Sequence, residues 1–203
     1  MNKKIRKLCW LIMFCSIFIS ANLFAHPHIF IDNTLTIVFD ENGLTGIKTR
    51  WVFDEMFSSM IREDYDTDKD GSFSPAEIDR IEKEAFSNLK NFHYLAYIKI
   101  NGEKFIVQYV KDFSVRLSAN RVIYTFFIPC HVLAGPSDKE VRISMYDNTY
   151  YIDVALVEKD PVRVENTSSV DCRYNVVDNT ENYHYYCGQV SPYEIILKFK
   201  KQS

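Results

Sequence analysis

Apolar and polar residues alternate along most of this 203-residue chain, which is the pattern of β-strands that bury one face. The alternation covers residues 28–39, passes through a turn at 40–43, and resumes over residues 44–53. An Asn101-Gly102 pair marks a second hairpin turn. The other stretches with this pattern are residues 94–100, 104–110, 113–117, 122–128, 141–146, 150–157 and 193–199. The sequence therefore predicts a chain built mainly of antiparallel strands.

Between residues 54 and 92 the hydrophobic period changes to that of a helix. A first helix would place five apolar residues on one face: Phe53, Met56, Phe57, Met60 and Ile61. A second helix would begin after the N-cap Ser74, with Pro75 in its first turn and Glu77 completing a capping box. Its apolar stripe consists of Ile78, Ile81, Ala85, Leu89 and Phe92. The pattern thus indicates a helical hairpin inserted into the β body.

The N-terminal segment has the composition of a secretory signal peptide. Four basic residues lie within the first seven positions, residues 8–20 are almost wholly apolar, and Ala25 offers a small residue for cleavage. The alternative is a membrane anchor, but this apolar run is shorter than the roughly 20 residues that span a bilayer. We therefore expect cleavage after Ala25, export to the periplasm, and a processed chain that does not span the membrane.

The processed chain is expected to fold as a single domain over residues 26–203. Its 47% hydrophobic and 25% charged composition is that of a globular protein, and no linker rich in proline or glycine flanks the helices. We predict an α+β fold, with a mainly antiparallel, sandwich-like β body that carries an EF-hand helix–loop–helix at about 54–92. The full chain has a net charge of −3, and loss of the basic leader makes it about −7, which argues against nucleic-acid binding.

Residues 66–77 match the twelve-residue calcium loop of an EF-hand. Acids at positions 1, 3 and 5 direct oxygens to one centre, a glycine at position 6 permits a sharp turn, and a glutamate at position 12 closes the site. The predicted calcium ligands are Asp66, Asp68, Asp70, Ser72 (through its carbonyl), Ser74 and Glu77. The alternative is an acidic surface loop. Because sensor EF-hands usually occur in pairs and this chain has one, a structural calcium ion is favoured over a sensing role.

The processed chain keeps three of the five cysteines, in keeping with an oxidising compartment. Cys172 and Cys187 flank a polar stretch that could reverse the chain, so we predict a disulfide between them. Cys130 ends an apolar run and is predicted to be a buried thiol rather than a nucleophile.

Cleavage after Ala25 would make His26 the first residue and place His28 two positions later. In an extended segment both imidazoles share one face with Phe30 and Asp32, and the free amine lies beside them. Imidazole and amine nitrogens suit Zn, Cu, Ni and Co, although two histidines at a chain start can also be merely solvated. His93, His131 and His184 are scattered and are predicted to be packed or surface residues. No hydrolase, P-loop or dinucleotide signature is present, so we do not expect an enzyme.

Several segments together resemble a known bacterial family: 25–28 at the cleavage junction, 51–58, the acidic loop, and 146–151. This uncharacterised exported family is catalogued as a domain of unknown function, and its members are often labelled the periplasmic component of an ABC-type transport system. They are commonly encoded beside nickel/cobalt-type permeases or exporters. The resemblance implies metal handling in the periplasm, with His26 and His28 as the residues that carry it.

Two functions of different classes follow. The leading hypothesis is a periplasmic metal-binding accessory protein for transport or homeostasis of a divalent transition metal (Ni, Co, Zn or Cu), with a structural calcium ion and a membrane permease or exporter as partner. The alternative is a calcium-stabilised β-rich interaction module without a transition-metal role, which meets its partner through the aromatic residues near Tyr185. An enzyme with a terminal-histidine copper centre is a third and weaker hypothesis.

Overall fold

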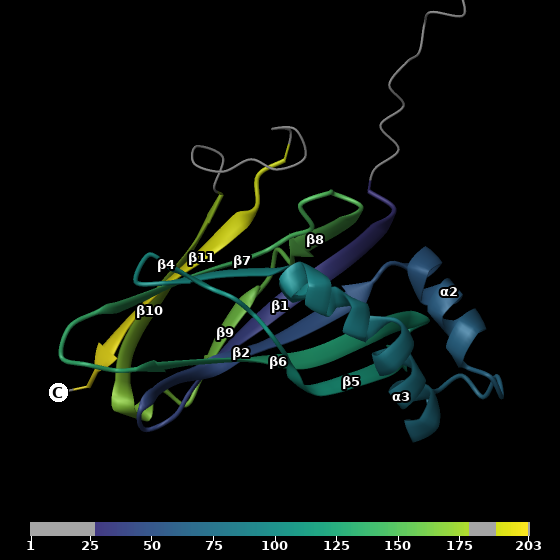
Figure 1. Ribbon diagram of the computed structural model, residues 1–203, viewed down its shortest axis with the longest axis horizontal. Coiled ribbons are helices and arrows are strands. Elements are labelled where there is room, and N and C mark those ends of the chain that lie inside the picture. Colours follow the sequence, from purple (N-terminus) through teal and green to yellow (C-terminus); the bar gives the residue numbers. More distant parts are fainter. Residues whose placement is uncertain (1–26, 179–189, 203) are drawn as a thin grey trace, which may run out of the picture.

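The computed structural model describes residues 27–178 and 190–202, and its strands form two sheets (Figure 1). Sheet A contains β1 (Ile29–Phe39), β2 (Gly43–Phe53), β5 (Lys111–Ser118), β6 (Arg121–Leu133), β8 (Ile152–Leu156) and β9 (Val162–Glu165). Sheet B contains β3 (Ala96–Ile100), β4 (Glu103–Phe105), β7 (Lys139–Met145), β10 (Val170–Asp178) and β11 (Tyr193–Lys201). The predicted α+β class is confirmed.

Sheet A is mixed rather than purely antiparallel. Its order is β5-β6-β2-β1, and β1 pairs on its other edge with β8 and then with β9, both in parallel. β8 covers the first half of β1 and β9 the second half. Pro161 lies between the two short strands, where its missing amide hydrogen does no harm, and its carbonyl accepts a hydrogen bond from the Leu35 amide at 2.9 Å.

The core lies between the sheets and extends under the helices. Sheet B has the order β10-β11-β7-β3-β4, and alternate residues of its strands face sheet A. Phe39 of β1 and Phe199 of β11 meet edge to face with ring centroids 5.1 Å apart, which joins the two layers. On sheet A, Trp51 packs edge to face on Phe126, with centroids 4.9 Å apart. Both sheets therefore contribute to one hydrophobic cluster.

The helices lie beside β5 and β6 at one end of sheet A (Figure 1). They are α2 (Glu55–Tyr65), α3 (Pro75–Glu84) and the 3-10 helix η1 (Phe86–Leu95), whereas the short 3-10 helix η2 (Thr167–Ser169) lies apart from them, directly before β10. Phe86 stacks on Phe113 of β5 with centroids 4.1 Å apart, and the Ser58 hydroxyl accepts a hydrogen bond from the Val122 amide at 2.9 Å. These contacts attach the helix pair to the sheet.

Some predicted boundaries are wrong. The second helix was expected to reach Phe92, but α3 ends at Glu84 and the chain tightens into η1, where His93 and Tyr94 have positive φ. The strand expected over residues 104–110 is only the short β4. β9 and β10 were not predicted. β10 lies at an edge and leaves most of its residues exposed, so its sequence shows little alternation.

The predicted signal peptide, residues 1–25, lies outside the described residues, as does His26. Within the described ranges, every helix is too short or too polar to cross a membrane.

Candidate functional site

The acidic loop is held between two capped helices. Asp54 is the N-cap of α2, and its carboxylate accepts a hydrogen bond from the Phe57 amide at 2.9 Å. α2 ends at Tyr65, and Asp66 follows at its C-terminus, where the Asp66 amide donates to the Arg62 carbonyl. Ser74 caps α3, with Pro75 in the first turn. The two helix ends thus determine where the loop begins and where Glu77 lies.

Three of the predicted calcium ligands lie together. One carboxylate oxygen each from Asp66, Asp68 and Asp70 comes within 4.8 Å of the other two. Gly71 has a φ of +81°, a region that favours glycine, and its amide donates to Asp66 Oδ2 at 3.2 Å. The loop therefore turns at the predicted position and gathers negative charge there.

Asp66 is the buried member of this group. Its residue is only 6% exposed, and its Oδ1 atom has no hydrogen-bond partner among the described residues. A buried carboxylate oxygen without a partner destabilises the fold, because it has lost its hydrogen bonds to water and no protein hydrogen bond replaces them. This atom is therefore where a bound cation would stabilise the loop most.

Glu77 does not join the three aspartates in this structure. Its Oε1 atom accepts hydrogen bonds from the Thr67 amide and hydroxyl, both at 2.7 Å. Its Oε2 atom accepts from the Ser74 amide and hydroxyl, both at 2.9 Å. These bonds, with the Thr67 hydroxyl foremost, lower the pKa of the Glu77 carboxyl to about 2. Glu77 is thus ionised and buried at the twelfth position, but its oxygens contact the loop backbone.

The two serines of the loop have different roles. The Ser72 amide and hydroxyl both donate to Asp70 Oδ1, at 2.8 and 2.7 Å. The Ser74 hydroxyl also accepts a hydrogen bond from the Glu77 amide, so Ser74 and Glu77 form the predicted capping box. Both serines therefore hold acidic side chains of the loop in place, in addition to the carbonyl or hydroxyl oxygen that each could offer to a cation.

Of the two predicted transition-metal ligands, His28 is among the described residues and His26 is not. His28 is exposed at the start of β1, its amide donates to the Tyr151 carbonyl at 2.9 Å, and its ring centroid lies 4.9 Å from that of Tyr151. Asp32, which was expected to share its face, forms an ion pair with Arg121 at 2.9 Å. In the described part of the chain, His28 belongs to no group of three metal-ligating side chains.

The predicted disulfide is not seen among the described residues. Cys172 carries a free thiol on β10, where it packs against the hydrophobic core, and its predicted partner Cys187 lies outside the described residues. Burial, and then the neighbouring Asp171, raise the pKa of the Cys172 thiol. Cys130 is buried as predicted, and burial raises its pKa to about 12, so it is a packing residue rather than a nucleophile.

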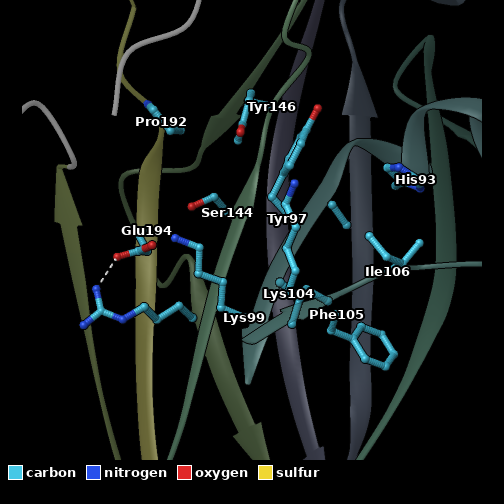
Figure 2. Close-up of a pocket in the computed structure, with 13 residues that line it drawn as sticks. His93, Tyr97, Lys99, Lys104, Phe105, Ile106, Ser144, Tyr146, Pro192 and Glu194 are labelled. Atoms are coloured by element: carbon cyan, nitrogen blue, oxygen red, sulfur yellow. Dashed lines mark hydrogen bonds and ion pairs between the residues drawn. The ribbon is translucent and has the colours of Figure 1, made fainter. Parts of the chain in front are cut away.

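A cavity of about 590 Å³ lies on the side of sheet B that faces away from sheet A (Figure 2). Its floor includes Tyr97, whose ring stacks on Tyr146 with centroids 3.9 Å apart. Arg142 and Glu194 form an ion pair at 3.0 Å in the same cavity. This cavity could not be predicted from the sequence, because its residues come from four strands, from η1 and from the segments between them, and no local motif joins them.

The chain is similar in sequence to uncharacterised bacterial proteins. Residues 11–187 match a family described as Protein of unknown function (DUF1007). An uncharacterized protein of Haemophilus influenzae is 28% identical over 152 residues, which cover 72% of this chain and 70% of the relative. An uncharacterized 15.5 kDa protein of Spirochaeta aurantia is 27% identical over 133 residues, which cover 64% of this chain and 91% of the relative.

Proposed function

This chain belongs to the DUF1007 family, and we propose that it is an exported metal-binding accessory protein with a structural calcium ion in the loop 66–77. The transition-metal ligands in this proposal are His26 and His28, and the partner is a membrane permease or exporter of a divalent metal. The observation that carries the calcium site is the buried, unpartnered Oδ1 of Asp66 beside two further carboxylates.

The spacing of the aspartate oxygens suits calcium. Ca²⁺ binds oxygen at about 2.3–2.6 Å, so two ligands on opposite sides of the ion are at most about 5 Å apart. Oxygens of Asp66, Asp68 and Asp70 that lie within 4.8 Å of one another can therefore share one ion. The hard oxygen donors favour calcium over the softer transition metals.

Glu77 completes the site by a small rearrangement. Its side chain is already ionised, and its helix position is set by the capping box with Ser74. In the proposed bound state its oxygens exchange bonds from Thr67 and Ser74 for the cation. Calcium then links the end of α2 to the start of α3, which stabilises the helix pair against sheet A.

Isothermal titration of calcium into the processed chain tests this site. We expect binding in the range of extracellular calcium modules, with dissociation constants of roughly 0.1 to 1 mM. Glu77→Gln keeps a capping acceptor but loses the carboxylate, so it should weaken binding strongly. Glu82→Gln, an exposed acid on α3 outside the loop, is the matched control and should bind like the parent. Equal affinities in all three proteins would refute the site.

The transition-metal part depends on processing, because the amine of His26 can coordinate only after cleavage. Zn, Ni, Co and Cu should bind the processed chain more tightly than a chain extended ahead of His26 or a His28→Ala variant. His131→Ala removes an exposed histidine elsewhere and is the control. If all four proteins bind equally, the calcium-stabilised interaction module becomes the better interpretation.

A further inference from the structure

The face of sheet A that points away from the core carries an unusual set of charges. Residues directly opposite each other on neighbouring strands share a face, and the register aligns Ser114, Thr125, Arg50 and Thr34 across β5, β6, β2 and β1. The buried neighbours of Arg50 on β2, Thr49 and Trp51, point the other way, into the core. Arg50 therefore lies near the middle of the outer face.

Three more cations lie on the same side of the sheet. In the register, Lys48 is paired with Thr36, which is in turn paired with Arg163 on β9. Arg116 on β5 is two residues from Ser114 and so shares its face. We call these four residues the cationic face: Lys48, Arg50, Arg116 and Arg163.

The four cations of the cationic face are not neutralised by ion pairs. None of its four side chains forms an ion pair with a described residue, and Lys48, Arg116 and Arg163 are exposed. Three acids lie on the same side of the sheet: Asp32, which is paired with Arg121, Asp153 on β8, and Glu165, two residues from Arg163 on β9. Burial, and then the charges of Arg116, Arg163 and Arg121, lower the pKa of the Arg50 guanidinium. Like charges are thus held close together on a chain whose net charge is negative.

Hydroxyl groups fill the positions between the cations. Thr36, Thr125 and Ser114 lie in the same rows, and their side chains make no hydrogen bond within the described residues. Arginine binds phosphate through two parallel N–H donors, and serine and threonine hydroxyls add further donors to phosphate oxygens. The chemistry of the face is therefore that of a phosphate-binding surface.

We propose that the cationic face of sheet A docks on an anionic membrane surface and binds its phosphate headgroups. An anionic membrane is favoured because its charge is opposite to that of the cationic face and because the face is wide. Neighbouring strands lie about 4.8 Å apart, so five strands from β9 to β5 extend over roughly 20 Å, far more than one small anion needs. Because cations outnumber acids on this face, whereas the full chain has a net charge of −3, the chain would dock in one orientation.

The test is co-sedimentation of the processed chain with vesicles of phosphatidylcholine that contain one-third phosphatidylglycerol. We expect binding that falls with added salt and is absent on pure phosphatidylcholine. A triple variant, Arg50→Gln with Arg116→Gln and Arg163→Gln, should bind on the order of 100-fold more weakly, because each cation near an anionic surface contributes about fivefold. Circular dichroism checks its fold, and Arg116→Gln, at an exposed position, gives a single-site measurement if the triple variant is unstable.

The matched control removes the same charge elsewhere: Lys83→Gln, Lys90→Gln and Lys201→Gln, all exposed and outside the face. It should retain most of the binding. Equal loss in both triple variants, or no dependence on phosphatidylglycerol, would overturn the proposal. Binding to soluble polyglutamate but not to vesicles would overturn the proposal in favour of an acidic protein partner. Saturable binding of inorganic phosphate at constant ionic strength, without vesicle binding, would overturn it in favour of a small-anion site.

Discussion

The acidic loop and the cationic face concentrate charge of opposite sign in opposite ways. The loop brings one oxygen from each of three carboxylates, drawn from five consecutive residues, within 4.8 Å of the other two, and one of these aspartates is buried. The face spreads four cations over three strands, β2, β5 and β9, with side chains at the surface. A compact set of oxygens suits one small ion, whereas a spaced array of guanidinium groups suits an extended anion. The size of the ligand that each region suits therefore depends on how closely the backbone places its charged side chains.

The largest expected effect concerns the loop. Calcium at a hundred times its dissociation constant should stabilise the fold by about 2.7 kcal/mol, because only the native loop gathers the ligands. For a domain of this size that raises the melting temperature by roughly 5–10 °C. Asp66→Asn should lose most of this rise in a thermal scan with calcium against EDTA. Asp64→Asn, an exposed acid just before the loop, should keep it. If Asp66→Asn keeps the full calcium-dependent rise in melting temperature, the loop is not the compact single-ion site described above.

A pH profile of stability sharpens the role of Glu77. Its folded pKa of about 2 lies below the value of about 4.3 in an unfolded chain, so its stabilising contribution is fully present above the unfolded pKa. That contribution is lost as pH falls through about 2. Denaturation in calcium-free buffer should therefore show a shallower loss of stability in Glu77→Gln than in the parent between about pH 5 and pH 2. Parallel profiles would show that the hydrogen bonds to Glu77 do not stabilise its charge.

The smallest expected effect tests whether the cationic face and the acidic loop bind their ligands independently. Asp32→Asn removes the acid that pairs with Arg121 beside the cationic face, so vesicle binding should tighten by about fivefold. Calcium affinity should not change, because Asp32 lies on β1, outside the loop. Vesicle co-sedimentation and calcium titration on the same protein measure both. A shift in calcium affinity would mean that the regions are coupled and cannot be compared as independent sites.

The loop could be predicted because its chemistry lies within twelve consecutive residues. Ser74, Pro75 and Glu77 form the predicted cap, and Gly71 turns the chain where the spacing requires it. The same reasoning missed that Glu77 is bonded to Thr67 rather than placed with the aspartates. That choice is made by side-chain packing at the helix start, which spacing does not describe.

Long-range pairing explains the other failures. The parallel addition of β8 and β9 to β1 depends on contacts more than a hundred residues apart in the chain, and no local pattern reports the direction of a strand. The disulfide prediction rested on spacing and on a polar stretch that could reverse the chain, and neither reports that Cys172 on β10 packs against the core. The early end of α3 reflects the packing of Phe86 on Phe113, a contact with sheet A that overrides the helical period.

By itself, the sequence determined the α+β class, the hairpin of β1 and β2, the two capped helices and the acidic loop between them, because each depends on residues close together in the chain. Which cations share the outer face of sheet A depends instead on how the strands pair. Arg50, Arg116 and Arg163 are neighbours because hydrogen-bonded register aligns β2, β5 and β9 across β6 and β1, and register is a property of the assembled sheet.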